Sequence, residues 1–249
     1  MKKLNRALNL ILPLLPVIAI VVLWAISARS VNNDMLLPTV KQTFTALIDL
    51  FKDKQFYISL LGTILRSLVA FILSFSIAFT LAVLSVKNAV FRKVMSPVVK
   101  IMRALPTIAI ILLLLLWTNS IIAPIVVTTL VVLPTSYTHL ESAFSSLDKT
   151  VSEAGRVDGA GEIDVFLKVE LPQAFPSVFT AIGSGISLNF KLMVAAEVLA
   201  QTAKSIGYML NVSKAYFETA EMMALVVIAI LFGVIVESIF NFIAKKTER

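Results

Sequence analysis

The chain has 249 residues, of which 58% are hydrophobic and 15% charged, and its mean hydropathy is +0.93. This composition is typical of a protein that crosses a membrane several times, and it excludes an ordinary soluble domain. The net charge of +7 does not indicate nucleic-acid binding, because Lys and Arg gather in short connections and at the chain ends, where they orient membrane helices. A single histidine and no cysteine argue against a zinc site built from protein ligands.

The first apolar run, residues 8–26, is expected to be a membrane span with a cytoplasmic N-terminus. Lys2, Lys3 and Arg6 precede it and favour that orientation. A cleaved signal peptide is the competing interpretation, but the run is longer than the roughly 7–15 apolar residues of a signal peptide. A retained helix is therefore favoured.

Residues 32–57 are not apolar enough to span a bilayer. Behind Pro38 and Thr39, apolar residues recur at helical spacing and predict an amphipathic helix; they are Val40, Phe44, Leu47, Ile48 and Phe51. Such a helix lies either at the outer membrane interface or against the rest of the protein, and the sequence leaves both open.

Five further spans are predicted over residues 58–86, 101–117, 121–137, 178–200 and 222–243. A basic connection, residues 87–103, follows the second span, and a polar stretch, residues 148–172, follows the fourth. With an inside N-terminus, these two connections and both termini share one side, which carries 14 Lys and Arg against 6 on the other side. The positive-inside rule places that side in the cytoplasm.

The pattern of residues 148–172 predicts a loop on which another protein docks. Val151, Ala154 and Val157 recur three apart and predict a short amphipathic helix. Gly159 and Gly161 then favour a reversal of the chain. Apolar residues return at helical spacing after Gly161, and Pro172 is expected to end this second short helix.

The same stretch carries a spaced motif. Glu153-Ala154-Gly155 is followed after three residues by Gly159, after nine more by Val169, and after one more by Leu171-Pro172. This resembles the EAA signature of ABC-importer permeases, Glu-Ala-Ala, three residues, Gly, nine residues, Ile, one residue, Leu-Pro. Gly155 replaces the second Ala and Val169 replaces Ile. Residues 63–71 and 195–199 resemble the sulfonate, taurine and nitrate branch of these permeases, with Ala70 where that branch has Gly.

The resemblance implies an all-α membrane protein of six transmembrane helices, with the type I ABC importer permease fold in one domain over residues 1–249. It also implies a cytoplasmic coupling helix, both termini in the cytoplasm, and a bacterial inner (plasma) membrane location. Expected partners are cytoplasmic ABC ATPase subunits, an extracytoplasmic solute-binding protein, membrane lipid and a second permease copy, most simply as a homodimer. The expected ATPase-docking residues are Glu153, Ala154, Gly155, Arg156, Asp158, Gly159, Gly161, Leu171 and Pro172.

No phosphate-binding Gly-x4-Gly-Lys-Ser/Thr loop occurs in the sequence. The chain is therefore not expected to be an enzyme or to hold a cofactor, and ATP and Mg²⁺ are expected on the partner ATPase.

Arg66, Lys191 and Glu197 lie in or at the ends of predicted spans, where a charge costs about 2.5–3.5 kcal/mol unless it is paired or faces water. Lys191 is the candidate contact for an anionic or carbonyl-rich substrate; the alternative is that it snorkels toward the cytoplasm or pairs with a carboxylate on a neighbouring helix. Glu197 suits gating or a structural hydrogen bond, and Arg66 suits an interfacial anchor. Lys191 and Glu197 are six residues apart and cannot pair along one helix. The predicted translocation path consists of Lys191, Glu197, Ser187 and Asn189.

Two other classes of function compete with an ABC-importer permease. An intramembrane serine protease would use Ser187 as nucleophile and His139 as base. In that class of protease the serine precedes the histidine, whereas here the histidine comes first, and no Gly directly follows Ser187. A secondary transporter driven by an ion gradient is the alternative, although no two halves of matching pattern are visible. The substrate stays open between a sulfonate-, taurine- or nitrate-like solute and a pyrimidine or vitamin precursor.

Overall fold

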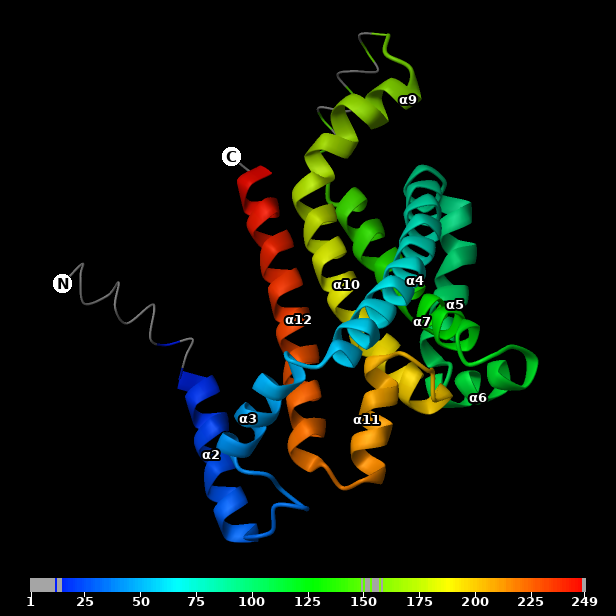
Figure 1. The fold of residues 1–249 in the computed structure, drawn as a ribbon. Coiled ribbons are helices and arrows are strands. Elements are labelled where there is room, and N and C mark those ends of the chain that lie inside the picture. Colours follow the sequence, from blue (N-terminus) through cyan, green and yellow to red (C-terminus); the bar gives the residue numbers. More distant parts are fainter. Residues whose placement is uncertain are drawn as a thin grey trace, which may run out of the picture.

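The computed structural model describes residues 12, 15–148, 150, 153, 157 and 159–247, and within them every regular element is helical. Figure 1 shows the helices as a bundle with the segment before α10 projecting from one end. The principal helices are α2 (Leu15–Val31), α3 (Val40–Leu50), α4 (Lys54–Lys87), α5 (Ala89–Ala104), α6 (Thr107–Trp117), α7 (Ile122–Ser145), α9 (Glu162–Val165), η2 (Phe166–Glu170, a π-helix), α10 (Leu171–Ala200), α11 (Ile206–Ala215) and α12 (Thr219–Thr247).

Helix α4 packs against α7, α10, α5 and α11. Its buried face is built largely from small side chains, and these are Ser59, Thr63, Ser67, Ala70, Ser74, Ala78, Ala82 and Ser85. Small residues allow helix backbones to approach closely. The opposite face exposes large apolar residues such as Leu61, Leu65 and Ile72, as a lipid-facing surface would.

Four helices stand side by side in the order α12, α10, α7 and α5, and α4 crosses the front of this row in Figure 1. Glycines let α10 approach α12 closely. A Cβ on Gly183 would lie 2.6 Å from the Cβ of Phe240, and one on Gly233 would lie 2.9 Å from Ser187 Oγ. The rings of Phe190 and Phe232 stack across the same contact with centroids 4.0 Å apart.

The predicted third span, residues 101–117, is not one helix. The basic stretch 87–103 is mostly helical, as α5, and begins at an Asn88 cap whose Oδ1 accepts from the N–H groups of Val90 and Phe91. Helix α5 ends at Ala104, and α6 leaves at a bend of 86°. Pro106 explains the break, because proline disfavours a helical conformation in the residue before it and Leu105 is extended.

The expectation that Pro172 ends a short helix is wrong. Helix α9 continues through η2 into α10, so residues 162–200 form one continuous helical rod. Pro172 is the second residue of α10 and has no N–H to donate, so the rod passes through it with one helical hydrogen bond missing. The wider π-helical turn precedes it, with the Leu171 N–H donating to the Phe166 carbonyl five residues back.

The N-terminal region partly settles the two alternatives for residues 32–57. Thr39 and Gln42 form a capping box at the start of α3. Helix α3 packs against α12 and buries Leu50, while Phe44 and Ile48 stay exposed on its other side. It therefore contacts the protein with one face and presents an apolar face outward.

Four described helical segments are long and apolar enough to cross a membrane: α4, α7, the rod 162–200 and α12. The bent pair of α5 and α6 makes a fifth if it is one span, and α2 is a shorter apolar helix.

Gly183→Ala should destabilise the solubilised protein, because the new methyl group must displace the Phe240 side-chain base from α10. Overpacking of this kind costs about 1–3 kcal/mol. Gly161→Ala is the control, since its nearest neighbour, Asp164 Oδ2, would be 3.8 Å away. Thermal unfolding in detergent measures both variants, and equal melting temperatures would contradict the close packing of α10 on α12.

Candidate functional site

The predicted docking loop, residues 148–172, is termed the coupling segment below. Glu153 and Val157 are helical and exposed, with the Val157 side chain 86% accessible. Ala154, Gly155, Arg156 and Asp158 lie outside the described residues. At the start of the segment, hydrogen bonds from the Thr150 hydroxyl and backbone N–H lower the pKa of the Asp148 carboxyl. The segment thus presents exposed helical residues at one end of the bundle (Figure 1).

Gly159 forms the turn that the sequence predicts. Its φ is +84°, a left-handed conformation that side chains with a Cβ rarely adopt, and a Cβ there would meet nothing within 4 Å. Gly161 has an ordinary φ of −67° and serves as the N-cap of α9. Leu171 and Pro172 begin α10, so they join the coupling segment directly to the rod.

The coupling segment is tied to the C-terminal end of α4. The Lys87 ammonium lies 4.0 Å from Glu162 Oε2 and 5.0 Å from the ring centroid of Phe166. Phe166 in turn begins a column of aromatic rings that runs along α7 and α4, with centroid separations of 5.3–6.4 Å: Phe166, Phe144, Phe79, Phe75 and Phe71. The column ends against α10, where a Cβ on Gly185 would lie 2.8 Å from Phe71 Cε2.

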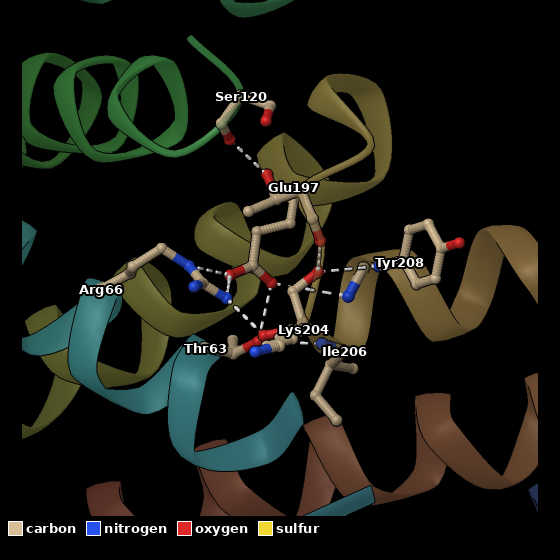
Figure 2. A network of polar contacts seen from close by, with 10 residues as sticks. Thr63, Arg66, Ser120, Glu197, Lys204, Ile206 and Tyr208 are labelled. Atoms are coloured by element: carbon tan, nitrogen blue, oxygen red, sulfur yellow. Dashed lines mark hydrogen bonds and ion pairs between the residues drawn. The ribbon is translucent and has the colours of Figure 1, made fainter. Parts of the chain in front are cut away.

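A buried polar network joins α4 to the other end of α10 (Figure 2). Glu197 is fully buried, and its Oε1 accepts from Arg66 Nε at 2.8 Å and pairs with Nη2 at 2.7 Å. Its Oε2 accepts from the Thr63 hydroxyl at 2.8 Å and the Gly207 N–H at 3.5 Å. Arg66 is therefore the partner of Glu197 and not the interfacial anchor that the sequence suggested.

The same network holds the connection between α10 and α11. Arg66 Nη2 donates to the Lys204 carbonyl at 3.1 Å, and the Ile206 N–H donates to the Thr63 hydroxyl at 2.9 Å. The close contacts of this connection require glycine on α4 and on α11. A Cβ on Gly62 of α4 would lie 2.4 Å from the Lys204 oxygen, and one on Gly207 of α11 would lie 2.5 Å from Glu197 Cβ. The connection between α10 and α11 is thus locked to α4.

The four residues of the predicted path do not lie together. Asn189 is buried and its Nδ2 donates to the Ser67 carbonyl at 2.7 Å and hydroxyl at 2.6 Å, on α4. Ser187 and Glu197 are also buried within the protein. Lys191 alone among the four is exposed, and its stem passes over Gly233, whose Cβ would lie 3.1 Å from Lys191 Cε.

A groove of about 430 Å³ lies between the C-terminal half of α7 and the N-terminal half of α10, and it is termed the polar groove because five of its eight lining residues carry hydroxyls. Hydroxyl side chains dominate its lining, which consists of His139, Ser142, Ala143, Ser146, Ser177, Thr180, Ala181 and Ser184. On the α5 side, Arg103 Nη2 donates to the hydroxyl of Thr138, next to His139, at 2.6 Å. The sequence interpretation missed this groove, although Ser177, Thr180 and Ser184 recur at helical spacing.

Comparisons with known proteins agree with this geometry. The family model described as "Binding-protein-dependent transport system inner membrane component" matches residues 74–249. The taurine transport system permease protein TauC of Escherichia coli is 22% identical, covering 92% of this chain and 85% of TauC. The formylaminopyrimidine transport permease protein ThiX of Halalkalibacterium halodurans is 24% identical, covering 94% of this chain and 92% of ThiX.

Among solved structures, the fold resembles a chain from inward-facing conformations of the MetNI methionine ABC transporter. The TM-score is 0.67 at 20% identity, over 76% of this chain and 94% of that one. The prediction of an all-α fold of the type I ABC importer permease class is therefore confirmed.

Arg66→Met should destabilise the protein strongly, because it leaves the Glu197 carboxylate buried without its counter-charge. Breaking a buried ion pair in this way costs about 3–5 kcal/mol, whereas replacing both partners by apolar residues often restores stability. We therefore expect Arg66→Met/Glu197→Met to unfold at a higher denaturant concentration than Arg66→Met. Lys52→Met is the control, since it removes only an exposed pair with Asp49. An Arg66→Met protein as stable as the control would contradict this role of the pair.

Proposed function

The chain belongs to the binding-protein-dependent transport system inner membrane component family and is the permease of an ABC importer, and we propose that its coupling segment receives the ATPase while its polar groove lines the path of the solute. The observation that carries this proposal is the continuous rod of residues 162–200. One helix joins the exposed coupling segment to the wall of the groove. Movement imposed on the segment would reach the groove without crossing a flexible joint.

The ATPase contact is proposed on the exposed face of the coupling segment, around Glu153, Ala154, Gly155, Arg156, Asp158 and Gly159. The left-handed Gly159 reverses the chain there, and Gly161, Leu171 and Pro172 direct it back into α10. ATP and Mg²⁺ would bind on the ATPase, and this chain would hold no cofactor. Movement of the segment would also displace Phe166, and through the aromatic column it would act on α4.

The solute path is proposed along the face of α10 and α7 that α4 does not cover. Lys191 and the groove hydroxyls lie on that side, and an ammonium facing lipid would cost about 2.5–3.5 kcal/mol. A second copy of the chain, related by a two-fold axis, would cover this face and complete the path. In this arrangement Ser187, Asn189 and Glu197 fix α10 against its neighbours, behind the path.

The remaining partners and the solute follow from the family and its named relatives. We expect an extracytoplasmic binding protein to deliver a small solute. TauC is named for taurine and ThiX for formylaminopyrimidine, so the solute is expected to be sulfonate-, taurine- or nitrate-like, or a pyrimidine or vitamin precursor. The membrane is expected to be the bacterial plasma membrane with both termini cytoplasmic, in keeping with the C-terminal end of α12 lying toward the coupling segment (Figure 1).

Affinity purification tests the docking proposal. The tagged chain, extracted from its native membrane in mild detergent, should bring with it an ATPase that contains a phosphate-binding loop, identified by mass spectrometry. Glu153→Lys/Arg156→Glu should lose it, because reversed charges oppose the ATPase groove. Asp49→Lys/Lys52→Asp reverses an exposed pair at the C-terminal end of α3 and in the turn that follows, and this variant should keep the ATPase. Wild-type chain recovered without any ATPase would contradict the proposal.

Gly159→Val should abolish most solute uptake while the chain inserts at the wild-type level. A β-branched residue cannot adopt φ of +84° without strain, so the turn that shapes the docking face would be lost. Gly161→Val, where φ is −67°, should affect uptake far less. Uptake is measured in proteoliposomes with the solute that the co-purified binding protein retains. Normal uptake by Gly159→Val would show that the left-handed turn is dispensable for coupling.

A further inference from the structure

Three polar groups at the contact between α10 and α12 have no partner among the residues that the structure describes: the Ser187 hydroxyl, the Lys191 ammonium and the Glu237 carboxylate. The hydroxyl is buried and makes no hydrogen bond. Within the described part of the chain, no carboxylate oxygen lies within 4.0 Å of the ammonium, and no cationic nitrogen lies within 4.0 Å of the Glu237 carboxylate. Ionisable side chains inside membrane spans generally pair with one another, so each of these two charges is expected to have a partner.

The three residues lie around one glycine of α12. A Cβ on Gly233 would lie 2.9 Å from Ser187 Oγ, 3.1 Å from Lys191 Cε and 3.7 Å from Lys191 Nζ. Glu237 is one helical turn beyond Gly233, on the same face of α12. Its Cα would lie 3.5 Å from a Cβ on Gly183, which is one turn before Ser187 on α10. Lys191 and Glu237 therefore flank Ser187 along the contact.

The direction in which the two long side chains lean brings their charges toward each other. Helices α10 and α12 are antiparallel, because they meet in reverse order of residue number, with Gly183 beside Phe240 and Lys191 beside Gly233. Side chains of an α-helix lean toward its N-terminus. Lys191 therefore leans along α10 toward the unpaired hydroxyl, and Glu237 leans along α12 toward Gly233. In an antiparallel pair these two directions converge.

We propose that Glu237 is the counter-ion of Lys191 and positions its ammonium through the Ser187 hydroxyl, which accepts from the ammonium and donates to the carboxylate. A hydroxyl can do both at once. Rotation of the two long side chains closes these contacts without moving either helix. Lys191 is exposed and Glu237 half-buried, so the chain itself does not keep water from them. Because two opposite charges attract weakly in water and strongly where water is excluded, the pair closes when water leaves this face of α10 and opens when water returns.

The consequence for transport rests on the proposed path of the solute, which Lys191 borders. While the path is wet, water hydrates the ammonium and the carboxylate separately. When the path closes and water is withdrawn, the pair leaves no uncompensated charge at this depth. Without Glu237, the ammonium would stay unpaired in the closed path, and that state would be disfavoured. Glu237 is thus a positioning residue for Lys191 and does not itself contact the solute.

Reversal of both charges tests the pair. Glu237→Gln and Lys191→Gln should each lower the rate of uptake by about tenfold. Lys191→Glu/Glu237→Lys should recover most of that rate, because the attraction does not depend on which helix carries which charge. Two residues with separate structural roles would instead give a double variant worse than either single one. Uptake is measured with the complete transporter in proteoliposomes, using the solute that the co-purified binding protein retains.

Ser187→Ala tests the hydroxyl between the two charges and changes the packing least. It should lower uptake in the otherwise wild-type transporter but cause no further loss in Glu237→Gln, since the contact that it serves is then already absent. The thermal stability of the complex gives a second measurement. Lys191→Gln/Glu237→Gln should unfold at a higher temperature than Glu237→Gln, which leaves the ammonium unpaired. The controls Asp49→Asn and Lys52→Gln remove the same charges from an exposed pair and should change neither quantity.

The outcomes separate the ion pair from the proposed function. Normal uptake by Glu237→Gln, or a charge-swapped variant no better than the single ones, would overturn the pair while the chain remained a permease. If the charge-swapped chain were not recovered from the membrane, equal losses from Ser187→Ala with and without Glu237→Gln would overturn it. A wild-type chain that holds no ATPase and imports nothing would contradict the proposed function. In that case the melting temperatures would still decide whether Glu237 is the counter-ion of Lys191.

Discussion

The attachment of α4 to α10 is the constraint on which the rest of the structure depends. It is made at two depths, by the Asn189 amide on Ser67 and by the Arg66 and Glu197 pair, and both are buried. A buried ion pair contributes little net stability, because the desolvation of both charges offsets their attraction. Its effect is on register: a sliding of α10 along α4 would leave Glu197 unpaired, so the two helices are fixed relative to each other.

At the opposite end of the bundle, the contact between α4 and the rod is aromatic and weakly ionic. Lys87 touches both Glu162 and Phe166, and the ring column continues from Phe166 to Phe71, beside Gly185. Aromatic rings packed against one another at these centroid separations cannot move independently. The rod is therefore held to α4 by the buried Arg66 and Glu197 pair at one end and by the ring column at the other, so a force on the coupling segment would act on α4 through these rings.

The sequence predicted features that depend on neighbours along the chain. The left-handed turn at Gly159 is confirmed, because glycine spacing after an amphipathic run is a local signal. The sequence could not predict the Arg66 and Glu197 pair, since the two residues are 131 positions apart and meet only after α4 and α10 pack. The helix through Pro172 was missed because a π-helical turn before the proline is not visible in apolar periodicity. The groove was missed because the sequence does not show which side of α10 stays uncovered. The hydroxyl residues form a groove only when α4 and α12 cover the other sides of the helix.

The contrast between the two uncovered surfaces of the bundle shows what must complete it. Helix α6 exposes Leu112, Leu116 and Trp117, as suits contact with lipid, whereas the inner half of α10 exposes Ser177 and Thr180. The Thr180 hydroxyl donates to the Pro176 carbonyl of its own helix, but lipid gives the Lys191 ammonium no partner, so this face requires either water or another protein surface. A two-fold axis beside α10 would set two such faces opposite each other, so each copy would shield the groove of the other from lipid.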